Sequence, residues 1–125
     1  CNVARASRMG DTPGGQFEIP RNIIRAVANN YFEMAPGTTH EATFCCGGGG
    51  GVLTDELLEL RVKGSMPRMG ALKQVVDQHG VNFMATICAI CKAQFTKVLP
   101  YYKFNRGMVG GVHQLVSTAI QLGDK

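Results

Sequence analysis

Five cysteines in a distinctive order constrain this 125-residue chain more than any other feature of its sequence. Cys1 opens the sequence, Cys45 and Cys46 are adjacent, and Cys88 and Cys91 form a C-x-x-C pair. Thiolates are soft ligands that select iron–sulfur clusters, zinc or copper(I). An odd number of cysteines rules out a fully paired disulfide framework. The pattern therefore indicates a metal or cluster site in a reducing, cytoplasmic compartment.

A run of five glycines, from Gly47 to Gly51, directly follows the adjacent cysteines. Because glycine has no Cβ, such a run lets the backbone approach a bulky group closely. We therefore expect Gly47, Gly48 and Gly49 to line the site of the bound group. The run matches neither G-x-G-x-x-G nor the P-loop pattern, so a phosphate site is not favoured.

Length and composition fit one domain, residues 1–125, with a single modest core. No apolar stretch approaches the roughly 20 residues that span a bilayer, so no direct membrane span is expected. The net charge of +4 is spread along the chain and tryptophan is absent, so no nucleic-acid partner is expected. The sequence begins with Cys-Asn-Val and has no initiator methionine, which suggests a fragment of a longer protein.

The apolar periodicity and the turn residues predict an α/β fold, a small sheet flanked by helices. Residues 1–19 are expected to form a loop. Helices are expected over 20–28, 54–63, 67–79, 88–99 and 112–120, and strands over 31–34, 41–44 and 81–87. Functional groups in open α/β sheets gather at the carboxyl ends of strands. Since both cysteine pairs follow predicted strands, we expect them to meet at one edge of the sheet.

A structural zinc site that uses four of the five thiols is one alternative. Such sites usually show two short-spaced pairs such as C-x-x-C, whereas here one pair is adjacent and a fifth cysteine lies far upstream. A ferredoxin-like cubane would show the compact C-x-x-C-x-x-C spacing, which is absent.

The order C…CC-G…C-x-x-C resembles the cysteine-rich CCG domain of the heterodisulfide-reductase family. Finer similarity, over nearly all of the chain, is to the DsrK-type subunit of the membrane complex associated with dissimilatory sulfite reduction. The segments that carry this similarity are 1–8, 44–55, 87–95, 97–102 and 111–116.

The resemblance implies a noncubane [4Fe–4S] cluster. Its implied ligands are Cys1, Cys45, Cys46, Cys88 and Cys91. The implied chemistry is reduction of a disulfide or trisulfide by two electrons, delivered one at a time. The implied partners are a membrane-embedded, quinone-linked cytochrome subunit and a DsrC-like sulfur-carrier protein as substrate. The protein would then be cytoplasmic and attached to the inner face of the membrane through its partners. The family's ferredoxin-like amino-terminal part is missing, so we expect a carboxy-terminal fragment.

Two other functions are compatible with the same residues. The domain could serve electron transfer alone, as the iron–sulfur subunit of an enzyme that oxidises 2-hydroxy acids or glycerol phosphate. The glycine run and the carboxy-terminal Val-His-Gln segment favour the disulfide-reducing function over this one. A zinc-stapled, non-catalytic interaction domain is the second alternative, and metal analysis distinguishes it.

Overall fold

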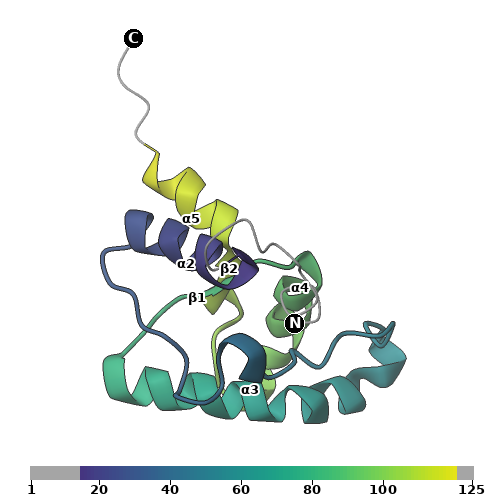
Figure 1. Ribbon diagram of the computed structural model, residues 1–125. Coiled ribbons are helices and arrows are strands. Elements are labelled where there is room, and N and C mark those ends of the chain that lie inside the picture. The colour runs from purple at the N-terminus through teal and green to yellow at the C-terminus, as the bar shows by residue number, and fades with distance from the viewer. Residues whose placement is uncertain (1–14, 121–125) are drawn as a thin grey trace.

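Helices dominate residues 15–120, the part of the chain that the computed structural model describes (Figure 1). The α-helices of this part are α2 (Gly15–Val27), α3 (Leu58–His79), α4 (Ala89–Val98) and α5 (Val112–Ala119). Short 3-10 helices span His40–Ala42, Asp55–Leu57, Leu99–Tyr102 and Arg106–Met108. The strands are β1 (Met84–Thr86) and β2 (Val109–Gly111). The fold is therefore helix-rich and α/β-like, with a smaller sheet than the sequence suggested.

The two strands pair in parallel, with Met84 opposite Val109 and Thr86 opposite Gly111. Parallel strands need a crossover connection, and α4 supplies it. The prediction of a strand over 81–87 is confirmed at its centre. Strand β2 was not predicted because glycines in a strand weaken it and usually mark turns. A Cβ at Gly110 would lie 2.5 Å from the Phe83 Cζ, so a larger residue in this strand would displace that ring.

The other two predicted strands are absent. Residues 31–34 belong to no strand in the structure, and Glu41 lies in the 3-10 helix His40–Ala42. Residues 31–34 are held by side-chain contacts and not by the backbone hydrogen bonds of a strand. Arg21 of α2 forms an ion pair with Glu33, with 2.6 Å between Nε and Oε2. Cys45 and Cys46 therefore follow a loop, not a strand.

Two helix predictions were wrong in their boundaries. Helix α2 begins at Gly15 instead of Pro20, so the last five residues of the loop predicted over 1–19 are helical. The first 14 residues of that predicted loop lie outside the described part of the chain. The helices predicted before Gly64 and after Pro67 form one helix of 22 residues, α3. Proline removes a backbone donor and tends to break helices. Side chains from other elements hold this helix just before Pro67: Gln94 donates to the carbonyl of Arg61, and the Tyr102 hydroxyl donates to that of Val62.

The remaining helix predictions are confirmed. Helix α4 follows Cys88 and gives way at Leu99 to a 3-10 turn that contains Pro100. Helix α5 covers most of the predicted range 112–120. In Figure 1, α3 lies along the bottom of the molecule, α2 and α5 pack together at the top, and the strands lie between them.

The hydrophobic core forms where α3 and α4 meet the strands. Its buried residues are Cys46, Met69, Leu72, Met84, Phe95, Val98, Leu99, Met108 and Val109. Cys46 is thus a core residue, and the loop that carries it is anchored between α3 and α4. This anchoring fixes the position of the cysteine motif relative to the rest of the fold.

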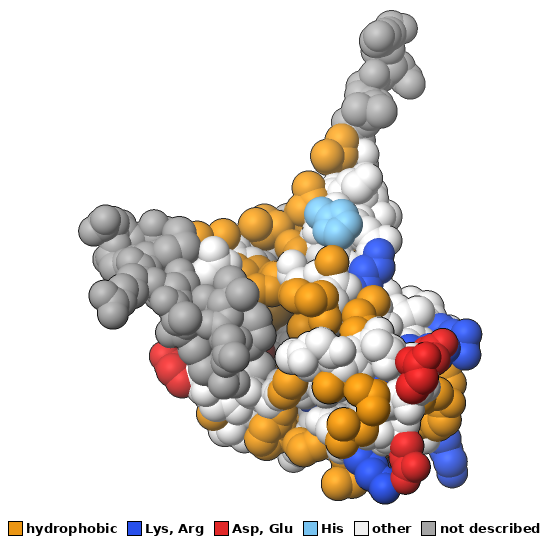
Figure 2. Space-filling model, turned by 90° about the vertical axis from the view of Figure 1, so that its right-hand side faces the viewer, with side chains coloured by type: hydrophobic (Ala, Val, Ile, Leu, Met, Phe, Trp, Pro, Cys, Tyr) orange, Lys and Arg blue, Asp and Glu red, His pale blue; other side chains and the backbone are white. Residues whose placement is uncertain are grey.

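The outer surface is mixed in character. Figure 2 shows hydrophobic side chains across much of one face, with acidic and basic side chains gathered at its lower right. Large apolar side chains beside the C-x-x-C pair are exposed, among them Ile87 and Ile90. Within residues 15–120, no helix combines the length and the apolar character needed to cross a membrane.

Candidate functional site

The structure brings the two cysteine pairs together at one place. Cys45 is exposed and Cys46 is buried, and both lie in the loop before the glycine run. Cys88 is the residue that caps the amino terminus of α4, and Cys91 lies in the first turn of that helix; both are half-buried. We predicted that both pairs follow strands and meet at a sheet edge. In the structure only Cys88 and Cys91 follow a strand, whereas Cys45 and Cys46 are brought to the same place by a loop. Cys1 lies outside the described residues.

The four sulfur atoms form one continuous group. The thiol of Cys91 lies against that of Cys46, and each also contacts its own motif partner, Cys88 and Cys45 respectively. Backbone donors add to this arrangement: the Gly47 N–H donates to the Cys45 Sγ over 3.3 Å, and the Gly48 N–H to the Cys46 Sγ over 3.4 Å. Four soft donors from two distant segments therefore share one site.

These contacts shift the pKa values of Cys46 and Cys91 in opposite directions. The hydrogen bond from Cys91 lowers the pKa of Cys46 to about 6, with further help from the Gly48 N–H and against the opposing effect of burial. The pKa of Cys91 is raised, first by this same hydrogen bond and then by burial. Cys46 is therefore the more acidic of the two central thiols, and the thiolate is the form of cysteine that binds metals.

The first glycines of the run differ in what they contact. A Cβ at Gly47 would lie 2.7 Å from the Ser65 nitrogen, so the loop touches the backbone of α3 there. A Cβ at Gly48 would lie 3.0 Å from the Gln94 Cβ, whereas Gly49 faces open space and lines the cavity described below. At Gly47 and Gly48 the backbone thus approaches the protein itself closely, and the predicted approach of Gly47, Gly48 and Gly49 to a bound group stays a prediction.

Gln94 is a site residue that the sequence analysis missed. It is fully buried on α4, three residues after Cys91, and its Nε2 donates to the carbonyl oxygens of Cys46 (3.0 Å) and Arg61 (3.1 Å). Its Oε1 accepts from the Arg61 Nε over 2.8 Å. The side chain therefore joins the cysteine loop to α3 and α4. A polar residue one helical turn after a cysteine of the C-x-x-C motif was the available signal.

We expect Gln94→Leu to destabilise the chain by about 2–3 kcal/mol, because three buried hydrogen-bonding groups lose their partner. Urea denaturation followed by circular dichroism measures this effect. Gln74→Leu is the matched control, since Gln74 is exposed on α3 and should change stability by less than about 0.5 kcal/mol. Equal stability of the two variants would contradict the buried role of Gln94.

A cavity of about 860 Å³ opens beside the sulfur group. All four described cysteines line it, together with Gly49, Arg68 and a largely apolar surface from α2, α3 and α5. This volume falls within the range of pockets that hold small molecules or cofactors, roughly 300–1,000 Å³. The sulfur atoms therefore face a space large enough for a bound group.

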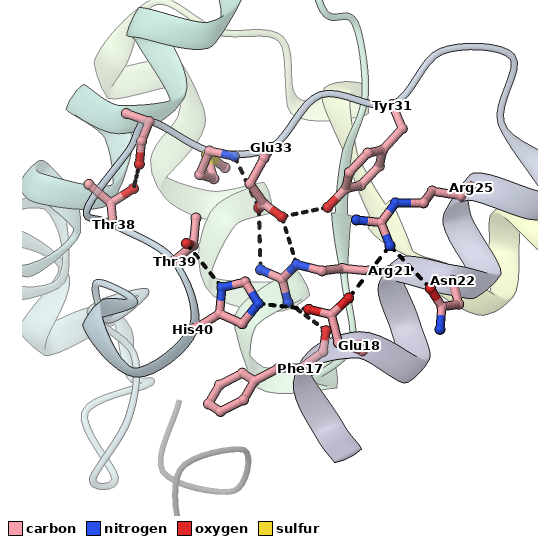
Figure 3. Close-up of polar contacts among 12 residues, drawn as sticks. Phe17, Glu18, Arg21, Asn22, Arg25, Tyr31, Glu33, Thr38, Thr39 and His40 are labelled. Atoms are coloured by element: carbon pink, nitrogen blue, oxygen red, sulfur yellow. Dashed lines mark hydrogen bonds and ion pairs between the residues drawn. The ribbon is translucent and has the colours of Figure 1, made fainter. Parts of the chain in front are cut away.

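A polar network forms another wall of this cavity (Figure 3). Arg21 is ion-paired with Glu33, and the Tyr31 hydroxyl donates to the same carboxylate over 2.6 Å. Burial alone would raise the pKa of Glu33, but the hydrogen bonds from Arg21 and Tyr31 lower it overall. Burial, and then the bond to Glu33, raise the pKa of Tyr31 to about 12. The negative charge of Glu33 is thus already neutralised by α2.

His40 belongs to this network and does not approach the cysteines as a donor. Its Nε2 lies 2.7 Å from the Glu18 Oε1, and its Nδ1 lies 3.1 Å from the Thr39 Oγ1. Figure 3 shows the imidazole between these two partners. His40 therefore ties α2 to the segment that leads into the cysteine loop.

The donor set fits a thiolate-bound metal cluster in its chemistry. Four thiols line one cavity, and two of them accept backbone N–H bonds, as the sulfur ligands of clusters do. Within residues 15–120, however, no three or more His, Cys, Asp and Glu side chains are placed to hold a metal ion.

Two curated relatives match nearly the whole chain. The chain is 46% identical over 122 residues to a protein of Archaeoglobus profundus named Hdr-like menaquinol oxidoreductase iron–sulfur subunit. It is 45% identical over 120 residues to iron–sulfur subunit 2 of the same name in Archaeoglobus fulgidus. These matches cover 98% and 96% of this chain, but the chain spans only 20% of the length of either relative. The similarities support the Hdr-like family.

Comparisons with family models and with solved structures add nothing to this result. No family model matches the chain, and no solved structure matches it. The relationship to the Archaeoglobus proteins therefore rests on sequence identity alone.

Proposed function

We propose that this chain, a homologue of Hdr-like iron–sulfur subunits, is the carboxy-terminal cysteine-rich domain of such a subunit and holds a noncubane [4Fe–4S] cluster. The ligands we propose are Cys1, Cys45, Cys46, Cys88 and Cys91. The observation that carries the proposal is the contact of four thiols from two distant segments at the wall of one cavity. The words iron–sulfur subunit in the names of both relatives support a cluster over zinc.

The residues of this chain have separate tasks in the proposed site. Cys46 and Cys91 place two sulfur atoms at its centre, and the N–H groups of Gly47 and Gly48 stabilise negative charge on the sulfur atoms they contact. When bound, a cluster of this kind supplies single electrons and an iron atom able to bind a substrate sulfur. The walls of the cavity beside the sulfur atoms are largely apolar, which suits the apolar part of a substrate.

The reaction we propose is two-electron reduction of a disulfide or trisulfide in a DsrK-type complex of dissimilatory sulfur metabolism. The substrate would be a DsrC-like sulfur-carrier protein, and the cavity beside the thiols offers room for its sulfur group. Electrons would pass between the domain and a membrane-embedded, quinone-linked cytochrome subunit at the inner face of the membrane. The words menaquinol oxidoreductase in the names of both relatives support the quinone link.

Metal analysis tests the cluster. We expect the full-length chain, purified without oxygen, to contain iron and acid-labile sulfide in equal amounts, because both relatives are named as iron–sulfur subunits and a [4Fe–4S] cluster holds the two in that ratio. Near-stoichiometric zinc without sulfide would instead identify the zinc-stapled interaction domain.

Electron paramagnetic resonance of the oxidised chain, with and without a small thiol, tests the reaction. A signal that appears or shifts on addition of thiol supports direct binding of a substrate sulfur. A signal indifferent to thiol would assign the domain to electron transfer alone, as in the enzymes that oxidise 2-hydroxy acids or glycerol phosphate.

A further inference from the structure

Arg68 places a buried positive charge beside the cysteines. It lies on α3, is only 5% exposed and lines the cavity. Its hydrogen bonds within residues 15–120 go to backbone carbonyls: Nη2 donates to Thr38 over 2.9 Å, and Nε and Nη2 donate to Phe44 over 3.3 and 3.2 Å. The guanidinium thus holds the residue directly before Cys45, yet no carboxylate of the described residues forms an ion pair with it.

The other two inward-facing arginines differ from Arg68 in this respect. Arg61 lies 3.4 Å from the Asp55 carboxylate, and Arg21 lies 2.6 Å from that of Glu33. Buried charges in proteins are normally paired, because an unpaired charge in a low-dielectric interior is costly. An arginine cannot escape this cost by losing its proton, since the guanidinium keeps its charge in proteins. The carbonyl groups and the Phe44 ring, whose centroid lies 5.8 Å from the Arg68 Cζ, stabilise this charge without neutralising it, so Arg68 is suited to a negative partner.

The cavity contains two candidates for that partner. Negative charge at Glu33, and to a smaller extent at Cys91, would act favourably on Arg68. Glu33 is already bound by Arg21 and by Tyr31, so its charge is largely neutralised. The sulfur group of the four cysteines is then the remaining source of negative charge at the cavity wall.

We infer that Arg68 supplies the counter-charge for the anionic group bound by the cysteines and thereby raises its reduction potential. The inference rests on the proposed function, because it requires a redox-active group on these thiolates. A fixed positive charge in a medium of low dielectric stabilises the more negative, reduced state of its neighbour. Net charge around a cluster is one of the terms that determine its potential. Arg68 is thus a positioning and charge-supplying residue, not a ligand.

A redox titration of the full-length chain, followed by electron paramagnetic resonance, tests this inference. We expect Arg68→Met to make the midpoint potential more negative by at least a tenfold change in the one-electron equilibrium, about 59 mV. Arg68→Lys keeps the charge and should stay close to the wild-type potential. Lys73→Met is the matched control on the same helix, because Lys73 is exposed and paired with Asp77. The midpoint potential of this variant should equal that of the wild type.

The two Arg68 variants separate charge from structure. Both lose the fork of hydrogen bonds to Thr38 and Phe44, so both should lower the thermal stability, whereas only Arg68→Met should shift the potential. Equal shifts in the methionine and lysine variants, or no shift in the methionine variant, would overturn the inference.

A second variant covers the case in which Arg68→Met fails to fold. Arg68→Gln also removes the positive charge but keeps an amide that can donate to the carbonyl of Thr38 or Phe44, and it should shift the potential in the negative direction. An unchanged or more positive potential in this variant would overturn the inference. A wild-type chain without iron and sulfide would instead contradict the proposed function, so the two failures are distinguishable.

Discussion

Replacing Cys46 by serine is expected to abolish iron and sulfide binding by this chain. Cys46 contacts the thiols of both Cys45 and Cys91, so it joins the two halves of the sulfur group. A serine hydroxyl is a harder and far less acidic ligand than a thiol, and it cannot replace a thiolate on a soft metal. Iron and acid-labile sulfide per chain, measured after anaerobic purification, give the result directly.

Two controls separate loss of a ligand from loss of the fold. Cys46 is a buried core residue, so the Cys46→Ser chain must first show wild-type helix content by circular dichroism. Met69→Leu changes another buried sulfur-containing side chain of the same core with little change in volume, and should keep its iron. Full iron content in a folded Cys46→Ser chain would remove Cys46 from the proposed ligand set.

The grouping of the cysteines could be anticipated from sequence because soft-ligand chemistry depends on residue type and order. The structural elements that bring the two cysteine pairs together could not be predicted from the sequence. The strand signals at 31–34 and 41–44 are short apolar runs, and such runs do not reveal whether a neighbouring strand exists to pair with. Here α2 binds the first run through Glu33, and the loop carrying Cys46 is anchored by core packing and by Gln94.

Helix α3 shows how tertiary contacts override local signals. Gly64 and Pro67 both predicted a break, and glycine in a helix interior costs about 1 kcal/mol relative to alanine. Gly64 lies where the glycine run crosses the helix: a Cβ there would be 3.4 Å from the Gly47 Cα. The glycine that suggested a helix end is therefore a contact point between two distant segments, which no local pattern encodes.

Arg68 and Gln94 had no role in the sequence-based site for the same reason. Each acts on the cysteine loop from a helix, and each is recognised by its burial and by the carbonyl groups it contacts. Charge and polarity at these positions are compatible with an exposed helix surface when only the sequence is considered. The supporting residues of the site thus emerge only from the fold.

Alanine at Gly47 is expected to destabilise the chain more than alanine at any other described glycine of the run. The Cβ would lie 2.7 to 2.9 Å from the Ser65 nitrogen, the Gly64 carbonyl carbon and the Arg61 oxygen. These are backbone atoms of α3, so none can rotate away. Gly47 also has φ +84°, a conformation that L side chains rarely adopt. Strain and overlap together should cost at least about 3 kcal/mol, measured by urea denaturation.

Gly50→Ala isolates the contribution of the backbone conformation. Gly50 has φ +68°, but nothing lies within 4 Å of its Cβ position, so this variant should lose only about 1–2 kcal/mol. The difference between the two variants then measures the contact with α3. Because the Gly47 N–H donates to Cys45, displacement of the loop in Gly47→Ala should also lower the iron content, whereas Gly50→Ala should retain it. Equal stability and iron content in the two variants would mean that the loop can leave α3 without consequence for the sulfur group.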